Sequence, residues 1–229
     1  MNNTLKPDYI GHRKRIKEKY KAGGLNGWLD YEILEFALSY AIPRRDTKAI
    51  AKELISRFKT INGVLDADKE ELKKVQGISE HTVLFIGFLK DVAIRYLEKG
   101  LYKKDLLSSP DAVYDYLKAS LKGAHDEEFK TMFLNNRNRL LAIETMQTGT
   151  VNKSVIYPRK IVERALYNHA ANVIIAHNHP GESLNPSEDD CKVTKIIRDA
   201  LKTVDIILLD HIIIGGDSYF SFKENGLEV

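Results

Sequence analysis

The sequence contains a single cysteine, Cys191, among its 229 residues. Internal disulfides and zinc sites built from several cysteines are therefore excluded. No uninterrupted run of about eighteen apolar residues occurs, so no membrane-spanning helix is expected. The first residues are polar and lack the apolar segment of a secretory signal peptide, which predicts a cytoplasmic protein.

The net charge is small, but charge is unevenly distributed along the chain. There are 35 Lys and Arg against 32 Asp and Glu, a formal net charge of +3. Residues 1–105 carry 21 basic and 15 acidic side chains, which gives +6, and residues 106–229 carry 14 and 17, which gives −3. This asymmetry permits a nucleic-acid-binding N-terminal half.

The apolar patterns divide the chain into two regions. Residues 1–104 show only helical spacing, which predicts an all-helical domain. Residues 107–229 alternate between strands and helices, which predicts an α/β domain with a mixed sheet and helices packed on it. The boundary is expected near 103–107. The apolar runs predict strands at 129–134, 139–146, 172–176, 206–214 and 219–222.

A glycine turn joins two short helical patterns in the N-terminal region. Gly77-Ile78-Ser79 resembles the hairpin of the helix-hairpin-helix motif, with Ser79 in place of the usual second glycine. Backbone N–H groups of that hairpin hold DNA phosphates without reading sequence. The resemblance implies DNA contacts at Gly77, Ile78 and Ser79, and the alternative is a packing module with no role in DNA binding.

Two histidines follow the apolar strand that ends at 176, and a carboxylate lies in the first turn of the next helix. His177 and His179 are two residues apart on extended backbone, so their side chains point to the same side. With Asp190 they offer two imidazoles and one carboxylate, which suits zinc with a fourth position open. Ser187 and Asp190 also form a helix capping box, which alone would be purely structural.

The combined pattern His-X-His-X7-Ser-X-X-Asp resembles the signature of the JAMM (JAB1/MPN) metalloproteases. Residues 176–180, 157–159 and 209–211 read Ala-His-Asn-His-Pro, Tyr-Pro-Arg and Leu-Asp-His, and they resemble the RadC family. That resemblance covers nearly the whole chain. The loop 180–186 keeps the family's length but departs from its usual Pro-Ser-Gly-Asp-Pro-X-Pro sequence.

The resemblance implies a deaminase-like α-β-α fold that binds one Zn²⁺ per chain through His177, His179 and Asp190. It implies hydrolysis of a peptide or isopeptide bond in a protein or peptide substrate, with Ser187 holding the water or the developing oxyanion. A glutamate that precedes an apolar strand would be the general base. Glu128 fits this position best. Glu144 is the reserve candidate, and Glu127 points the other way from Glu128 on an extended backbone.

An alternative function is that of a DNA-associated repair or recombination protein whose zinc domain is non-catalytic or nucleolytic. It rests on the hairpin and on the basic N-terminal half. Two further residues near the motif are expected to be structural. His211 follows a buried strand and is predicted to be a hydrogen-bonding residue, and Cys191 is turned about 100° away from Asp190 on a helix.

Overall fold

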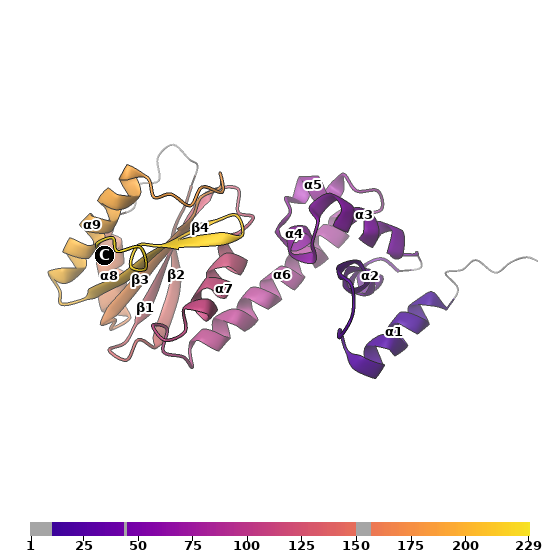
Figure 1. The fold of residues 1–229 in the computed structure, drawn as a ribbon, viewed down its shortest axis with the longest axis horizontal. Coiled ribbons are helices and arrows are strands. Elements are labelled where there is room, and N and C mark those ends of the chain that lie inside the picture. The colour runs from indigo at the N-terminus through magenta and orange to yellow at the C-terminus, as the bar shows by residue number, and fades with distance from the viewer. Residues whose placement is uncertain (1–10, 44, 150–156) are drawn as a thin grey trace, which may run out of the picture. The chain divides into compact units, whose positions relative to one another are not determined.

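The computed structural model describes residues 11–43, 45–149 and 157–229 (Figure 1). The chain divides into two compact units, residues 1–91 and 92–229. Among the described helices, none combines the length and the apolar character needed to cross a bilayer.

The first unit is helical, as predicted. Its helices are α1 (His12–Gly23), α2 (Asp30–Ala41), α3 (Lys48–Phe58), α4 (Ile61–Asp66), α5 (Lys69–Lys73) and the first part of α6 (Glu80–Leu101). Apolar side chains at helical spacing meet in one core, which includes Leu38, Leu54, Val64 and Ile86. Burial of these side chains is the main stabilising contribution that such short helices receive.

Basic side chains of α1 are used inside this unit. His12 hydrogen-bonds the buried carboxylate of Glu35 on α2. Arg13 donates to the carbonyl oxygens of Ser39, Ile42 and Arg45. These two side chains therefore fasten α1 to α2 and the segment that follows it.

The division between the units falls inside α6 and not at the predicted boundary near 103–107. The helix is continuous from Glu80 to Leu101. Ile94, Leu97 and Leu101 near its end pack into a core of the second unit. The sequence pattern shows where a helix stops, but it does not show which core each of its turns joins.

The second unit contains one mixed sheet. Its elements are α7 (Pro110–Leu121), β1 (Glu127–Leu134), β2 (Leu140–Gly149), α8 (Pro158–Tyr167), β3 (Asn172–Asn178), α9 (Glu188–Lys202), β4 (Ile207–Gly215) and β5 (Ser218–Ser221). The strand order is β2-β1-β3-β4-β5. β3 and β4 are parallel, and the other neighbouring pairs are antiparallel.

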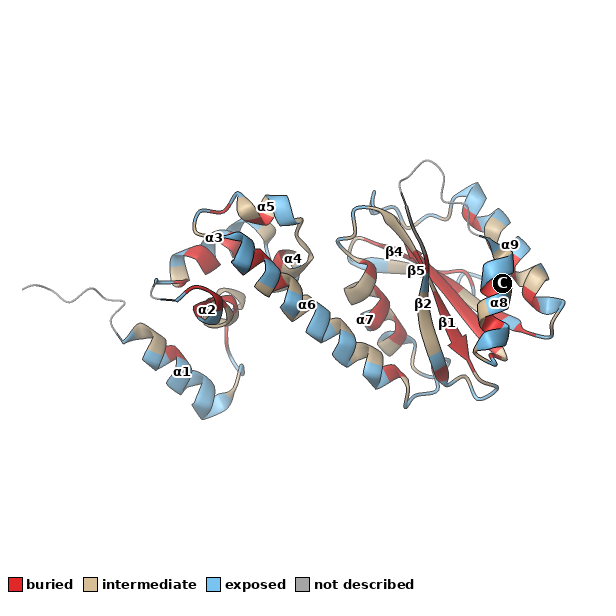
Figure 2. Ribbon diagram, turned by 180° about the vertical axis from the view of Figure 1, so that it is seen from behind, coloured by how far each residue is buried: buried red, intermediate tan, exposed pale blue. Residues whose placement is uncertain are grey.

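Helices cover both faces of this sheet (Figures 1 and 2). One face packs on α7, through Met132, Ile174 and Ile212 among others. The other face packs on α8 and α9, through Phe133 and Ile175 among others. The central strand β3 is buried along its whole length, which explains its uninterrupted apolar run. We call these two sides the α7 face and the α9 face.

One glycine in the first unit is required by its backbone conformation. Gly77 has φ +96°, and a Cβ there would lie 2.8 Å from Cδ1 of Ile50. Gly77→Ala should therefore destabilise the helical unit by about 1–3 kcal/mol. Gly87→Ala is the matched control, because Gly87 lies within α6 with no atom near its Cβ position. That change should stabilise the unit by about 0.5–1 kcal/mol.

Fluorescence of Trp28, the single tryptophan, follows unfolding of this unit in both variants. A Gly77→Ala variant as stable as the wild type would contradict the requirement for a positive φ at this position.

Candidate metal centre

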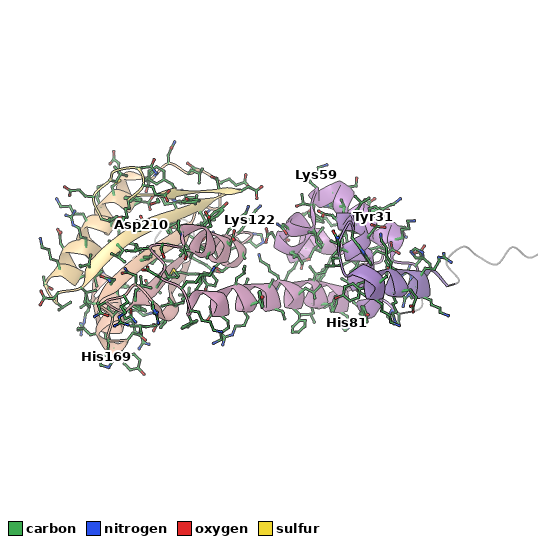
Figure 3. All side chains as sticks on the ribbon, turned by 60° about the horizontal axis from the view of Figure 1, so that its bottom comes forward. Tyr31, Lys59, His81, Lys122, His169 and Asp210 are labelled. Carbon is green, nitrogen blue, oxygen red and sulfur yellow. The ribbon has the colours of Figure 1, made fainter. Side chains whose placement is uncertain are left out.

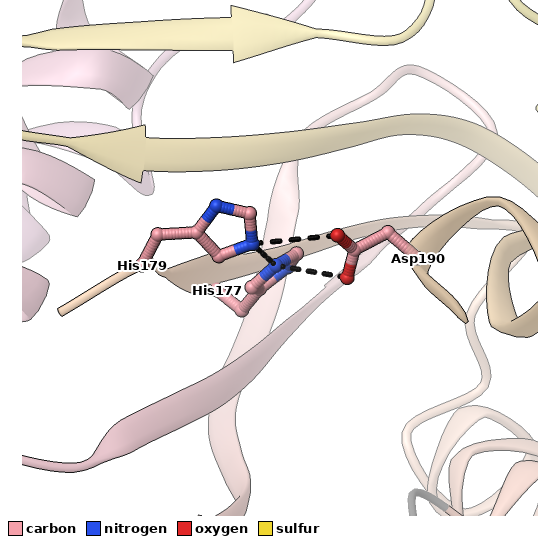
Figure 4. A group of neighbouring side chains, drawn as sticks. All are labelled: His177, His179 and Asp190. Atoms are coloured by element: carbon pink, nitrogen blue, oxygen red, sulfur yellow. Dashed lines mark hydrogen bonds and ion pairs between the residues drawn. The ribbon is translucent and has the colours of Figure 1, made fainter. Parts of the chain in front are cut away.

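Three side chains converge at one end of β3: His177 from the strand, His179 from the residue just after it, and Asp190 from α9 (Figure 4). Nε2 of His177 lies 2.9 Å from Nε2 of His179. These two nitrogens lie 3.2 and 3.3 Å from the two carboxylate oxygens of Asp190. One ligand atom from each residue lies within 4.8 Å of the others, so the group could hold a metal ion. The predicted residues are thus brought together with their ligand atoms facing one point.

Asp190 is positioned by the start of α9. Its backbone N–H donates to Oγ of Ser187, and its Oδ2 accepts from the backbone N–H of Ser187, which completes the predicted capping box. The Ser187 hydroxyl also donates to Oδ2 of Asp190, at 2.7 Å. Helix capping therefore fixes the position of the Asp190 carboxylate without a metal. The hydroxyl hydrogen of Ser187 is already used in its hydrogen bond to Asp190.

The His179 ring is oriented by the loop that follows it. Nδ1 of His179 lies 2.8 Å from the carbonyl oxygen of Ser183, so Nδ1 carries a hydrogen and Nε2 presents its lone pair to the site. Gly215 allows this arrangement, because a Cβ there would lie 2.9 Å from the same carbonyl oxygen. The loop 180–186, which departs from its usual family sequence, thus still orients a predicted ligand.

The His177 ring is oriented by a buried chain of hydrogen bonds. Nδ1 of His177 lies 2.8 Å from Nε2 of His211, and Nδ1 of His211 lies 2.6 Å from Oγ1 of Thr194. The Thr194 hydroxyl donates its only hydrogen to the carbonyl oxygen of Asp190. It must therefore accept a hydrogen from Nδ1 of His211.

Burial lowers the pKa of His211 well below its usual value, so the ring is neutral. With hydrogen on Nδ1, its Nε2 can only accept, and Nδ1 of His177 must donate to it. The lone pair of His177 is then on Nε2, which faces the site. The prediction that His211 is a hydrogen-bonding residue is confirmed. The contribution of Thr194 had no signal in the sequence.

The electrostatics of the three ligands favour a bound cation. Burial alone would raise the pKa of Asp190, but hydrogen bonding with His177 and His179 outweighs it and holds the pKa well below its usual range. Hydrogen bonding with Asp190 raises the pKa of His179. In the metal-free chain a proton on Nε2 makes these hydrogen bonds, and a metal ion would take the place of that proton between the nitrogen lone pairs and the carboxylate. The donor set therefore fits a divalent metal ion.

The structure places the two adjacent glutamates of β1 on opposite faces of the sheet. Oε1 of Glu127 lies 4.0 Å from Nε2 of His177, on the α9 face. Oε2 of Glu128 lies 3.6 Å from Nζ of Lys130 instead. The side chain of Asn178 joins the start of β1 to the end of β3, because its Oδ1 accepts a hydrogen bond from the backbone N–H of Glu128. Glu127 therefore faces the three candidate ligands and Glu128 does not, and the role of general base for Glu128 stays a prediction.

The reserve candidate for the base is committed to another interaction. Both oxygens of Glu144 accept hydrogen bonds from the Arg164 guanidinium, each at 2.6 Å, and Oε1 also accepts from Asn168. The hydrogen bonds from Arg164 lower the pKa of Glu144. This carboxylate links β2 to α8, and the structure does not bring it to the metal centre.

The hairpin residues of the first unit have structural roles. Gly77 provides the turn, Ile78 is buried in the core, and the hydroxyl of Ser79 accepts from the backbone N–H of Thr82 at the start of α6. The neighbouring lysines are paired with Glu70, Glu71 and Glu80. DNA contact at 77–79 therefore stays a prediction, with no excess of unpaired cations beside the described hairpin to favour it.

The hydrogen-bond chain predicts a role for a residue that does not itself face the metal. Thr194→Val removes the acceptor for His211, so the ring is free to carry its hydrogen on Nε2 and to reverse the tautomer of His177. Zinc affinity should fall about 10–100-fold, and the lost buried hydrogen bond should cost about 1–3 kcal/mol of stability. Thr194→Ser keeps the hydroxyl and should retain zinc affinity. Competition with a chromogenic chelator measures the zinc affinity of the two variants. Equal affinities would contradict the hydrogen-bond chain.

Comparison with known proteins assigns the family. A family model described as a RadC-like JAB domain matches residues 107–227. UPF0758 protein FN0909 of Fusobacterium nucleatum is 37% identical over 227 residues, which cover 96% of this chain and 98% of that protein. UPF0758 protein SPO0054 of Ruegeria pomeroyi is 36% identical over 221 residues, which cover 96% and 99%. These matches and the mixed sheet with its helices agree, and the chain belongs to the RadC family.

Proposed function

We propose that this protein is a zinc-dependent hydrolase of amide bonds, acting on peptide or isopeptide bonds of a protein or peptide substrate. The observation that carries the proposal is the convergence of His177, His179 and Asp190, with both rings held by other hydrogen bonds. Two imidazoles and one carboxylate are a ligand set of catalytic zinc sites, in which a fourth position stays open. Zinc, when bound, supplies a Lewis acid and makes water nucleophilic near neutral pH.

Glu127 is the residue best placed to move protons in this reaction. Its carboxylate is partly exposed and lies 4.0 Å from Nε2 of His177, so a water or a substrate nitrogen can reach it. It would accept the proton of the attacking water and return it to the amine that leaves. Glu128 contacts Lys130 and cannot share this task without a change of strand register.

Ser187 has a positioning role that supports the same proposal. Its hydroxyl donates to Asp190 and so orders the carboxylate that would bind zinc. The predicted role of Ser187 as donor to a developing oxyanion requires this hydrogen to turn toward the substrate. A cation bound to Asp190 would neutralise the carboxylate and weaken its hydrogen bond from Ser187, which favours that rotation.

Paired substitutions of the two adjacent glutamates test the assignment of the base. Glu127→Gln removes the proton acceptor but keeps the shape of the side chain, so hydrolysis should fall about 10²–10⁴-fold. Zinc content should be unchanged, since Glu127 is not one of the three ligands. Glu128→Gln is the matched control and should retain both activity and zinc.

Hydrolysis is measured on a library of quenched fluorescent peptides with the zinc-loaded full-length chain, and zinc content is measured on the same samples. Loss of activity in Glu128→Gln with full activity in Glu127→Gln would reverse the assignment. A wild-type protein that binds zinc but cleaves no peptide or isopeptide bond would contradict the proposed hydrolase.

A further inference from the structure

A cavity lies on the α7 face of the sheet, the face opposite to the metal centre. Its volume is about 300 Å³, at the lower end of the range for small-molecule sites. All the residues around it belong to the second unit. Its apolar surface comes mainly from α7, β4 and the segment before α7, and includes Leu107, Val113, Tyr114, Ile174 and Ile212.

One carboxylate lines this otherwise apolar cavity. Asp210 lies on β4 (Figure 3) and forms part of the cavity wall together with Ile212 and Tyr219. It reaches the α7 face because β4 contains one extra residue against β3. Val173 pairs with Leu208, and Ile174 pairs with Asp210, so Leu209 is the unpaired residue of a β-bulge. The bulge turns Asp210 toward α7 and the adjacent His211 toward the metal centre.

Asp210 is well hydrogen-bonded but has no counter-ion among the described residues. Its Oδ1 accepts from the backbone N–H groups of His211 and Lys223, and its Oδ2 accepts from the Ser221 hydroxyl at 2.6 Å. A carboxylate has about four acceptor positions, so one remains. No ion pair to Asp210 forms within the part of the chain that the structure describes. Burial raises the pKa of Asp210, as expected for a negative charge without a cationic partner.

We propose that this cavity binds a small organic cation, an amine or amidine attached to a compact apolar body. The apolar part would contact Val113, Ile174 and Ile212, and the cationic nitrogen would donate to the remaining acceptor position of Asp210. The rings of Tyr114 and Tyr219, whose centroids are 4.6 Å apart, border the same space and add to its apolar surface. This site is independent of the proposed hydrolysis.

The charges around the cavity disfavour the other two kinds of small ligand. The cavity lining holds two carboxylates, Asp210 and Glu224, against one cation, Lys223, so an anion would face an excess of negative charge. Lys223 contacts Asp210 through its backbone N–H. A neutral apolar molecule would shield Asp210 from solvent and offer no donor in exchange, which is costly for a partly buried carboxylate. A cation with an apolar body can contact the apolar walls and also neutralise the charge of Asp210.

Three probes with the same aromatic body separate these possibilities. Phenethylamine, 2-phenylethanol and phenylacetate are each titrated into isotope-labelled full-length protein, and backbone amide shifts of Ile212 and Tyr219 are followed by NMR. Phenethylamine should give saturable shifts and bind at least about tenfold more tightly than the other two. No saturable shift with millimolar phenethylamine, or equal binding of all three probes, would overturn the proposal.

Two variants locate the binding site. Asp210→Asn preserves the shape of the side chain and should weaken phenethylamine binding by at least about tenfold. Asp199→Asn is the matched control, because it removes one negative charge on α9, beyond the other face of the sheet. Leu107→Trp fills the partly exposed rim without changing charge and should also abolish binding, which keeps the test valid if Asp210→Asn folds poorly. Unchanged binding in Asp210→Asn or Leu107→Trp would contradict this site.

Discussion

The candidate metal centre depends on the direction of one hydrogen, the one that Nδ1 of His177 shares with His211. A histidine binds a metal only through a nitrogen that carries a lone pair, so its other nitrogen must donate. The direction is set at Thr194, where the only hydroxyl hydrogen is given to a helix carbonyl. A helix backbone thereby determines, through a buried neutral imidazole, which nitrogen of His177 faces Asp190. The same helix begins with the capping box that orders Asp190 itself.

The alternation of side chains across the sheet divides the second unit into two chemical environments. On the α9 face, Glu127 and His177 meet beside the start of α9. On the α7 face, Asp210 lies among apolar residues and borders a separate cavity. A single extra residue in β4 decides that His211 joins the first environment and Asp210 the second. Without this bulge the two side chains would exchange faces, and both the hydrogen-bond chain and the cavity would be lost.

Much of this arrangement could be predicted from the sequence because its signals are local. The apolar run before His177 predicts a buried strand, and the spacing of Ser187 and Asp190 predicts a capped helix start, so the convergence of the three ligand residues follows from short-range geometry. Which of the two adjacent glutamates faces the site could not be predicted reliably, since one residue of register decides between Glu127 and Glu128. The bulge at Leu209 and the contribution of Thr194 depend on pairing between distant segments, and neither has a local signature.

The most direct test of the account is the stoichiometry and ligand type of zinc bound to the wild-type chain. Metal analysis after dialysis of zinc-loaded protein measures the stoichiometry, and X-ray absorption spectroscopy on the same sample measures the ligand type. The account predicts one zinc ion per chain with nitrogen and oxygen neighbours only, two of them imidazoles. A protein that retains no zinc, or a sulfur neighbour from the exposed Cys191, would contradict the assignment of His177, His179 and Asp190 as the metal centre.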